Sequence, residues 1–229
     1  MESLLYTVSH DLKSPLLTVL GYIDLLRAEP VELAGEAARH VERIEASSLY
    51  MQQLINDLLM LSRIGRMEAR AEDVEVADLA REVADELRAQ SPGATVEVGT
   101  LPAVTMSPVR ARQLLTNLIG NAMNHAGRHD VTVDVGAKRL PDGGALLWIA
   151  DDGRGVPAQH RERVFGVFER LDERPAGEAG TGIGLAVCRK IVNQLDGTMR
   201  LADVPLGATV EIVLPGRVTG WRPSVGAEA

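Results

Sequence analysis

The spacing of the apolar residues changes near residue 70, and this change predicts a helical part followed by a mixed α/β part. Up to about residue 66, apolar side chains recur at steps of three and four, the period of an amphipathic helix. Beyond that point, β-like runs such as "DVTVDVGA" and "ALLWIADDG" alternate with helical stretches such as "PVRARQLLTNLIGNAMNHA". Strands mixed with helices favour a two-layer α/β sandwich, which we expect to be built on one sheet.

The first part reads as two helices, the second of them covering roughly residues 37–63. The short connection "AEPVELAGE" makes the two helices antiparallel neighbours. A lone hairpin with so many apolar residues would leave one apolar side of each helix exposed to water. We therefore expect the hairpin to form a homodimer, as a four-helix bundle. The predicted domains are residues 1–66 and 73–216, with residues 217–229 as a flexible tail.

Charge and composition exclude some classes of partner. The net charge of −8 argues against nucleic acid, because phosphate contacts need clustered Lys and Arg. No apolar run approaches the ~18 residues that a membrane span needs, so we expect no membrane contact by this stretch of chain. The single cysteine fits a reducing compartment. These features favour a cytoplasmic location and leave open a membrane anchor in a longer protein.

The stretch "SHDLKSPL" carries a candidate nucleophile, His10. We expect its ring to lie off the apolar face of the first helix and to face water, because His10 is about 200° around the helix from Leu12. Ser14 lies one turn later on the same face, and Asp11 is adjacent in sequence. A neighbouring carboxylate can orient and polarise an imidazole. On this segment alone, an ordinary surface histidine is the favoured interpretation.

Three further motifs follow in the second part. Asn117 and Asn121 share one helical face and can present amide oxygens to a metal or phosphate, or serve as caps or surface polar groups. "DDGRGVP" follows a strand, and its glycines allow close approach to a flat ligand, although a plain turn has the same pattern. "GEAGTGIGLAVCRKIV" places glycines just before a helix, where N–H groups can cradle phosphate. Each motif alone is weak evidence for a nucleotide site, and the three motifs in this order are strong evidence.

With these motifs in this order, the chain resembles the catalytic core of a bacterial sensor histidine kinase over roughly residues 3–216. "SHDLKSPL" resembles the H box, "NLIGNAMNHA" the N box, "DDGRGVP" the G1 box, "VFGVFERLD" the F box and "GTGIGL" the G2 box. The resemblance implies a dimerisation and histidine-phosphotransfer hairpin followed by a Bergerat-type ATP-binding domain.

The resemblance also implies roles for individual residues. His10 would be the phosphoacceptor, assisted by Asp11, and Asn121 would ligate Mg²⁺ with Asn117 beside it. Asp151 would accept a hydrogen bond from the exocyclic amine of adenine. Gly153 and Gly155 would form the floor under the base, and 171–180 a short ATP lid. Phe165 and Phe168 either pack at the base of the lid or belong to the core. The remaining residues expected to contact ATP are Arg170, Gly180, Thr181, Gly182, Gly184 and Leu185.

The implied function is ATP-dependent autophosphorylation of His10 and transfer to an aspartate of a response-regulator receiver domain. The chain departs from the common pattern at Asn124, where a Lys that meets phosphate is frequent, so that Arg170 or another cation would have to compensate. It also departs at Asp152, usually Asn, and at Ser14, which leaves phosphatase activity towards the regulator open. The alternatives are a pseudokinase scaffold that dimerises and docks a regulator, and a Bergerat ATPase without histidine transfer. The histidine hairpin argues against the last.

Overall fold

The computed structural model describes most of the chain in two compact units. One unit comprises residues 1–67 and 167–184, and the other comprises 68–166 and 185–229. His10, Asp11 and Ser14 lie outside the described residues. The described residues are 12, 16–26, 35–63, 70–89, 91–128, 130–171, 180–216 and 218–221.

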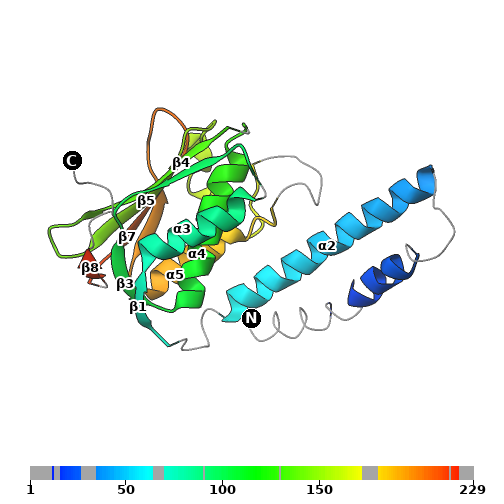
Figure 1. The fold of residues 1–229 in the computed structure, drawn as a ribbon, viewed down its shortest axis with the longest axis horizontal. Helices are drawn as coiled ribbons and strands as arrows, with labels where there is room; N and C mark the ends of the chain where they lie inside the picture. The colour runs from blue at the N-terminus through cyan, green and yellow to red at the C-terminus, as the bar shows by residue number, and fades with distance from the viewer. Residues whose placement is uncertain are drawn as a thin grey trace. The chain divides into compact units, whose positions relative to one another are not determined.

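The first unit contains the two predicted helices. Residues 16–26 are helical, and α2 runs over Glu36–Arg63, which confirms the expected second helix (Figure 1). Leu16, Ile23 and Ile55 are buried. Other large apolar side chains of these helices are 41–65% exposed in the single chain; they are Leu12, Leu17, Val19, Tyr22, Leu25, Leu26, Ile44, Leu49 and Met51. The two helices therefore carry more apolar surface than one chain covers. Among the described residues, no helix is long and apolar enough to cross a membrane.

The second unit has two sheets, whereas we expected a single one. The five-stranded sheet has the order β2-β4-β5-β7-β6, in which β2 and β4 are parallel and the other pairs antiparallel. The three-stranded sheet has the order β1-β3-β8 and is antiparallel. The strands are β1 (Glu72–Glu75), β2 (Thr95–Val98), β3 (Pro102–Met106), β4 (Thr132–Arg139), β5 (Ala145–Asp151), β6 (Thr198–Leu201), β7 (Thr209–Leu214) and β8 (Val218–Trp221).

Three helices of this unit lie on the same face of the five-stranded sheet: α3 (Val76–Arg88), α4 (Pro108–His125) and α5 (Gly184–Gln194) (Figure 1). The strands alternate so that one face is apolar and buried, for example Val133 and Val135 in β4. Apolar residues of α4, such as Leu118, and of β5, such as Ile149, line the same interior. This architecture of helices on one side of a sheet is the expected α/β sandwich. Two short 3₁₀ helices, η1 (Ala158–His160) and η2 (Arg163–Phe165), connect β5 towards α5.

Strand β8 falls within the segment that the sequence prediction treated as a flexible tail. Gly220 is opposite Ala103 and Trp221 is opposite Pro102 in the antiparallel pairing with β3. The pairing partners are more than one hundred residues apart in sequence, so no local pattern announces the strand. Residues 222–229 lie outside the described part of the chain.

Candidate functional site

Helix α4 carries the two candidate asparagines one turn apart, and both side chains are half-buried. Asn117 is a hydrogen-bonding neighbour of the Cys188 thiol on α5, and the Cys188 Sγ atom lies 3.9 Å from the Leu114 carbonyl oxygen. Complete burial raises the pKa of Cys188 to about 12. Asn117 therefore helps to join α4 to α5, and the role of Asn121 as a metal ligand stays a prediction. Asn124, one turn beyond Asn121 along the helix, is exposed.

Asp151 ends β5, and the backbone around it holds its carboxylate. Its Oδ1 atom accepts hydrogen bonds from the Gly153 N–H at 2.9 Å and from the Ala208 N–H at 3.2 Å. The Asp151 N–H in turn donates to the Ala208 carbonyl at 2.9 Å. The orientation of this half-buried carboxylate is therefore set by the fold, and its recognition of adenine stays a prediction.

The glycines of the G1 box are required by the packing of the turn itself. A Cβ on Gly153 would stand 2.4 Å from the Ala126 Cα, and a Cβ on Gly155 would stand 2.5 Å from the Gly207 carbonyl oxygen. Gly155 also has a φ of +72°, which disfavours other residues. The turn thus packs backbone against backbone on the end of α4 and on the loop before β7. Whether the same glycines lie beneath a base stays a prediction.

The F box separates into one core residue and one exposed residue. Phe165 is buried, and the guanidinium of Arg189 from α5 lies 4.2 Å from the centre of its ring. Arg189 also forms two hydrogen bonds with Glu162, at 2.6 and 3.0 Å. These bonds hold the pKa of Glu162 below its usual value. Phe168, which belongs to the first unit, is 56% exposed and has a φ of +66°.

The two ends of the segment predicted as the ATP lid meet within the first unit. The Phe168 N–H donates to the Gly182 carbonyl at 2.9 Å. Gly182 has a φ of +72°, and a Cβ there would stand 2.9 Å from the Glu169 carbonyl oxygen and 3.2 Å from the Arg170 Cγ. The Arg170 side chain therefore passes beside the G2 loop. Gly180 is exposed with open space around it, and residues 172–179 lie outside the described part.

Thr181 has a partner that sequence reasoning missed. Its hydroxyl donates to Asp57 Oδ2 at 2.5 Å and accepts from the Ile183 N–H at 3.4 Å. Thr181 is buried, and burial raises the pKa of the Asp57 carboxyl. A signal was present in the sequence, because Asp57 is an acid within the apolar run "LINDLLML" of α2. Gly184 and Leu185 begin α5, so the glycine loop does lead directly into a helix as predicted.

The structure therefore brings together Asp151, Gly153 and Gly155 beside the end of α4 in the second unit, and Arg170 and Gly182 in the first. The donor set suits magnesium bound through a nucleotide. Mg²⁺ takes oxygen ligands and is commonly held by one or two protein groups together with substrate phosphates. An amide oxygen such as that of Asn121 is of this ligand type, and its binding of Mg²⁺ stays a prediction. Among the described residues, no group of three or more His, Cys, Asp and Glu side chains could hold a metal ion.

Comparison with known proteins decides the family. Residues 1–66 match the family model of the His Kinase A (phospho-acceptor) domain, and residues 106–218 match that of the histidine kinase-, DNA gyrase B- and HSP90-like ATPase. The chain belongs to the sensor histidine kinases. The first match includes His10, and the second includes both asparagines of α4, the G1 turn and the G2 loop. All five expected motifs thus fall within the matched domains of this histidine kinase.

Individual relatives agree with this assignment. This kinase is 33% identical over 223 residues to the methanogenesis regulatory histidine kinase FilI of Methanothrix harundinacea, covering 94% of this chain and 24% of FilI. It is 32% identical over 229 residues to the sensor histidine kinase CpxA of Escherichia coli, covering 97% of this chain and 47% of CpxA. The chain therefore spans less than half the length of these curated relatives.

Solved structures also resemble this histidine kinase. The crystal structure of full-length ShkA in complex with AMPPNP matches with a TM-score of 0.76 and 26% identity, covering 96% of this chain and 47% of that one. The mycobacterial sensor histidine kinase MprB matches with a TM-score of 0.56 and 28% identity, covering 65% of this chain and 99% of that one. The likeness to ShkA extends over both predicted domains.

Proposed function

We propose that this kinase transfers the γ-phosphoryl group of ATP to His10. An imidazole nitrogen of His10 attacks the γ-phosphorus, the bond to the β–γ bridging oxygen breaks, and ADP leaves. Asp11 assists the ring, and the imidazole proton passes to solvent. The observation that carries this proposal is the presence of both matched domains in one chain, phosphoacceptor and ATPase.

In this proposal, different residues bind the adenine, the metal ion and the phosphates of the nucleotide. Asp151, held by two backbone N–H groups on Oδ1, has a fixed carboxylate suited to accept a hydrogen bond from the adenine amine. Asn121 would hold Mg²⁺ through its amide oxygen, and the ion would supply neutralisation of phosphate charge. The G2 residues supply N–H groups at the start of α5, where a helix N-terminus favours anions. The AMPPNP bound in the ShkA structure supports ATP as the nucleotide.

Arg170 is the cation that we propose to stand in for the missing lysine at position 124. Its side chain lies beside Gly182 in the G2 loop, with Cγ 3.2 Å from the position of a Cβ there. A guanidinium can bind phosphate oxygens bidentately, which a lysine cannot. Asn124 is exposed and neutral, so its own contribution to phosphate binding is at most a hydrogen bond.

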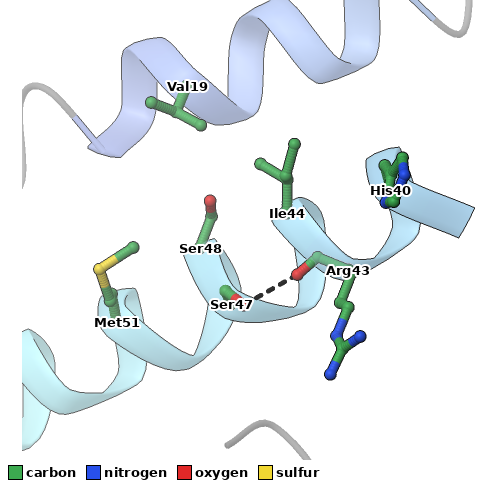
Figure 2. Close-up of a pocket in the computed structure, with 7 residues that line it drawn as sticks. All are labelled: Val19, His40, Arg43, Ile44, Ser47, Ser48 and Met51. Carbon is green, nitrogen blue, oxygen red and sulfur yellow. Dashed lines mark hydrogen bonds between the residues drawn. The ribbon is translucent and has the colours of Figure 1, made fainter. Parts of the chain in front are cut away.

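We propose that the exposed apolar face of the hairpin binds a second copy of the chain. Figure 2 shows a groove between the helix that bears Val19 and α2, lined on the α2 side by Ile44 and Met51. These three side chains are 41–50% exposed. His40, Arg43, Ser47 and Ser48 complete the lining, and the Ser47 hydroxyl donates to the Arg43 carbonyl at 2.8 Å. A dimeric four-helix bundle would cover this apolar surface.

The phosphorylated histidine would then serve a response regulator. A carboxylate oxygen of a receiver-domain aspartate attacks the phosphorus, the P–N bond breaks, and the imidazole is regenerated. Ser14, four residues after His10 in the sequence, has a hydroxyl that can orient water, so we propose that phosphatase activity towards the regulator is retained. The relatives named as sensor kinases support this two-component role.

A transfer assay tests the proposal and separates it from the pseudokinase alternative, which exposed Asn124 favours. The chain is incubated with Mg²⁺ and γ-labelled ATP, beside His10→Gln, Asn121→Ala and the control His160→Gln. We expect acid-labile, alkali-stable label on the unaltered chain and on the control, and none on the other two. Binding of ATP by the unaltered chain without any label on it would establish the pseudokinase instead.

A further inference from the structure

A bridging arginine fastens the loop after α4 to the G1 turn. Arg128 donates from Nε and Nη2 to the two carboxylate oxygens of Asp130, at 2.8 Å each. Its Nη1 atom donates to Asp152 Oδ2 at 3.4 Å. One guanidinium therefore faces two carboxylates, one from each segment. This planar fork is a geometry that lysine does not reproduce.

Asp152 is also bound to the start of strand β4. The Thr132 N–H donates to Asp152 Oδ1 at 2.9 Å, and the Asp152 N–H donates to the Thr132 carbonyl at 3.3 Å. The Asp152 side chain is 34% exposed, compared with 75% for Asp130. Asp152 is thus a partly buried carboxylate with one oxygen on the backbone and the other on Arg128.

The same turn is held against the end of α4. Gly153 packs on Ala126 with no room for a Cβ, and the Arg154 N–H donates to the Ala126 carbonyl at 3.0 Å. Asn121 lies on α4 little more than one turn before Ala126, and Asp151 immediately precedes Asp152. The contacts around Arg128 therefore connect the two elements that carry the adenine-binding and metal-binding groups.

We propose that Arg128 compensates the charge of Asp152 and thereby favours nucleotide binding. Asp152 places a negative charge directly after Asp151, beside the site proposed for a polyanionic ligand, and the Arg128 guanidinium neutralises that charge. This inference rests on the roles given above to Asp151 and Asn121 in nucleotide binding. It does not depend on transfer to His10.

The charge of residue 152 determines how the loss of Arg128 affects nucleotide binding. Without Arg128, the carboxylate of Asp152 would stand next to Asp151 without its described cationic partner, and the added negative potential would oppose binding of a polyanion. Replacing Asp152 by Asn removes that charge but keeps an oxygen that can accept from the Thr132 N–H. Loss of Arg128 should therefore be harmful when residue 152 is Asp and nearly harmless when it is Asn.

The test is a double-mutant cycle on the full chain, with the dissociation constant of Mg²⁺-ATP measured by calorimetry and the unfolding temperature measured beside it. We expect Arg128→Ala to weaken ATP binding about fivefold to tenfold, and the double variant Arg128→Ala/Asp152→Asn to bind within about twofold of the unaltered chain. The unfolding temperature should change little, because exposed ion pairs contribute little to stability.

Arg112→Ala is the matched control. Arg112 lies in helix α4, before the loop that bears Arg128, and also bridges two carboxylates, Glu82 at 2.6 Å and Glu86 at 2.9 Å. Its removal should leave the ATP dissociation constant unchanged. The inference is overturned if Arg128→Ala binds ATP as tightly as the unaltered chain, or if the double variant binds no better than Arg128→Ala. Because binding is measured directly, a failure of transfer to His10 would not affect either outcome.

Discussion

Gly153 lies so close to Ala126 that a Cβ at position 153 would stand 2.4 Å from the Ala126 Cα and 2.6 Å from its carbonyl oxygen. The atoms in the way are backbone atoms at the end of α4, which cannot rotate aside as a flexible side chain could. The turn that follows Asp151 is therefore seated directly on the helix that carries Asn121. This contact therefore sets the position of the turn after Asp151 relative to the helix that carries Asn121.

Gly153→Ala should disrupt the packing of the G1 turn against the end of α4. We expect a loss of about 1–3 kcal/mol of unfolding free energy, typical of overpacking, and ATP binding weakened at least about tenfold because Asp151 is displaced. Calorimetry of unfolding and of Mg²⁺-ATP binding measures both effects. Gly99→Ala is the control, since a Cβ there would meet the Val135 carbonyl oxygen at an ordinary 3.5 Å. Normal ATP binding by Gly153→Ala would contradict the claim that this packing positions Asp151.

Ile119→Ala should destabilise the second unit through a cavity under α4. Ile119 is fully buried, so truncation removes packing that the surroundings restore only in part. We expect a loss of about 2–5 kcal/mol of unfolding free energy, measured by denaturant titration. Val109→Ala on the same helix removes a side chain that is 71% exposed and should change the free energy by less than about 0.5 kcal/mol. Equal effects of the two variants would contradict the described packing of α4.

Arg189→Lys should weaken the connection between α5 and the F box. Lysine cannot keep both bonds to Glu162, and its cation stacks less well on Phe165. Because Glu162 is largely exposed, we expect a loss of no more than about 1 kcal/mol in unfolding free energy. Because the pairing lowers the pKa of Glu162, its stabilising contribution is present above the ordinary value of 4.5. The contribution disappears as the pH falls through the lowered pKa.

The measurement for this pair is the unfolding free energy of both proteins between pH 3 and pH 8. The difference between them should be constant at neutral pH and shrink towards acid pH. A difference that grows as the pH falls would exclude the ion pair as its source.

Cys188 should be inert in the native protein. The thiol is fully buried and its pKa is raised to about 12, so almost no thiolate exists near pH 8. We expect a disulfide reagent to label Cys188 only after denaturant unfolds the second unit, at a rate that then matches a free thiol. Labelling of the native protein at the rate of an exposed cysteine would show that α5 does not pack on α4 as described.

The periodic parts of the chain were predictable and the non-local contacts were not. The spacing of apolar residues gave helix α2 to within a residue, because that period depends only on local geometry. Strand β8 was missed, because it is short and its stability comes from pairing with β3, far away in sequence. The same reason explains the second sheet, which exists only through pairings of this kind.

The site shows the same limit at the level of single residues. The motif order indicated Asp151 and the glycines, but a pattern cannot tell that Gly153 is needed against Ala126 itself. It also could not divide Phe165 from Phe168, one buried and the other exposed. Arg128 and Asp57 stand outside the glycine motifs, and only the fold brings them to Asp152 and Thr181.

The most direct test of the central claim is to locate the phosphate. The chain is incubated with Mg²⁺-ATP, digested at alkaline pH and mapped by mass spectrometry, with His10→Gln as the control. The account predicts phosphate on the peptide that contains His10, on the imidazole, and none on any peptide of the control. Phosphate on another residue of the unaltered chain, or ATP consumption without any phosphohistidine, would contradict it.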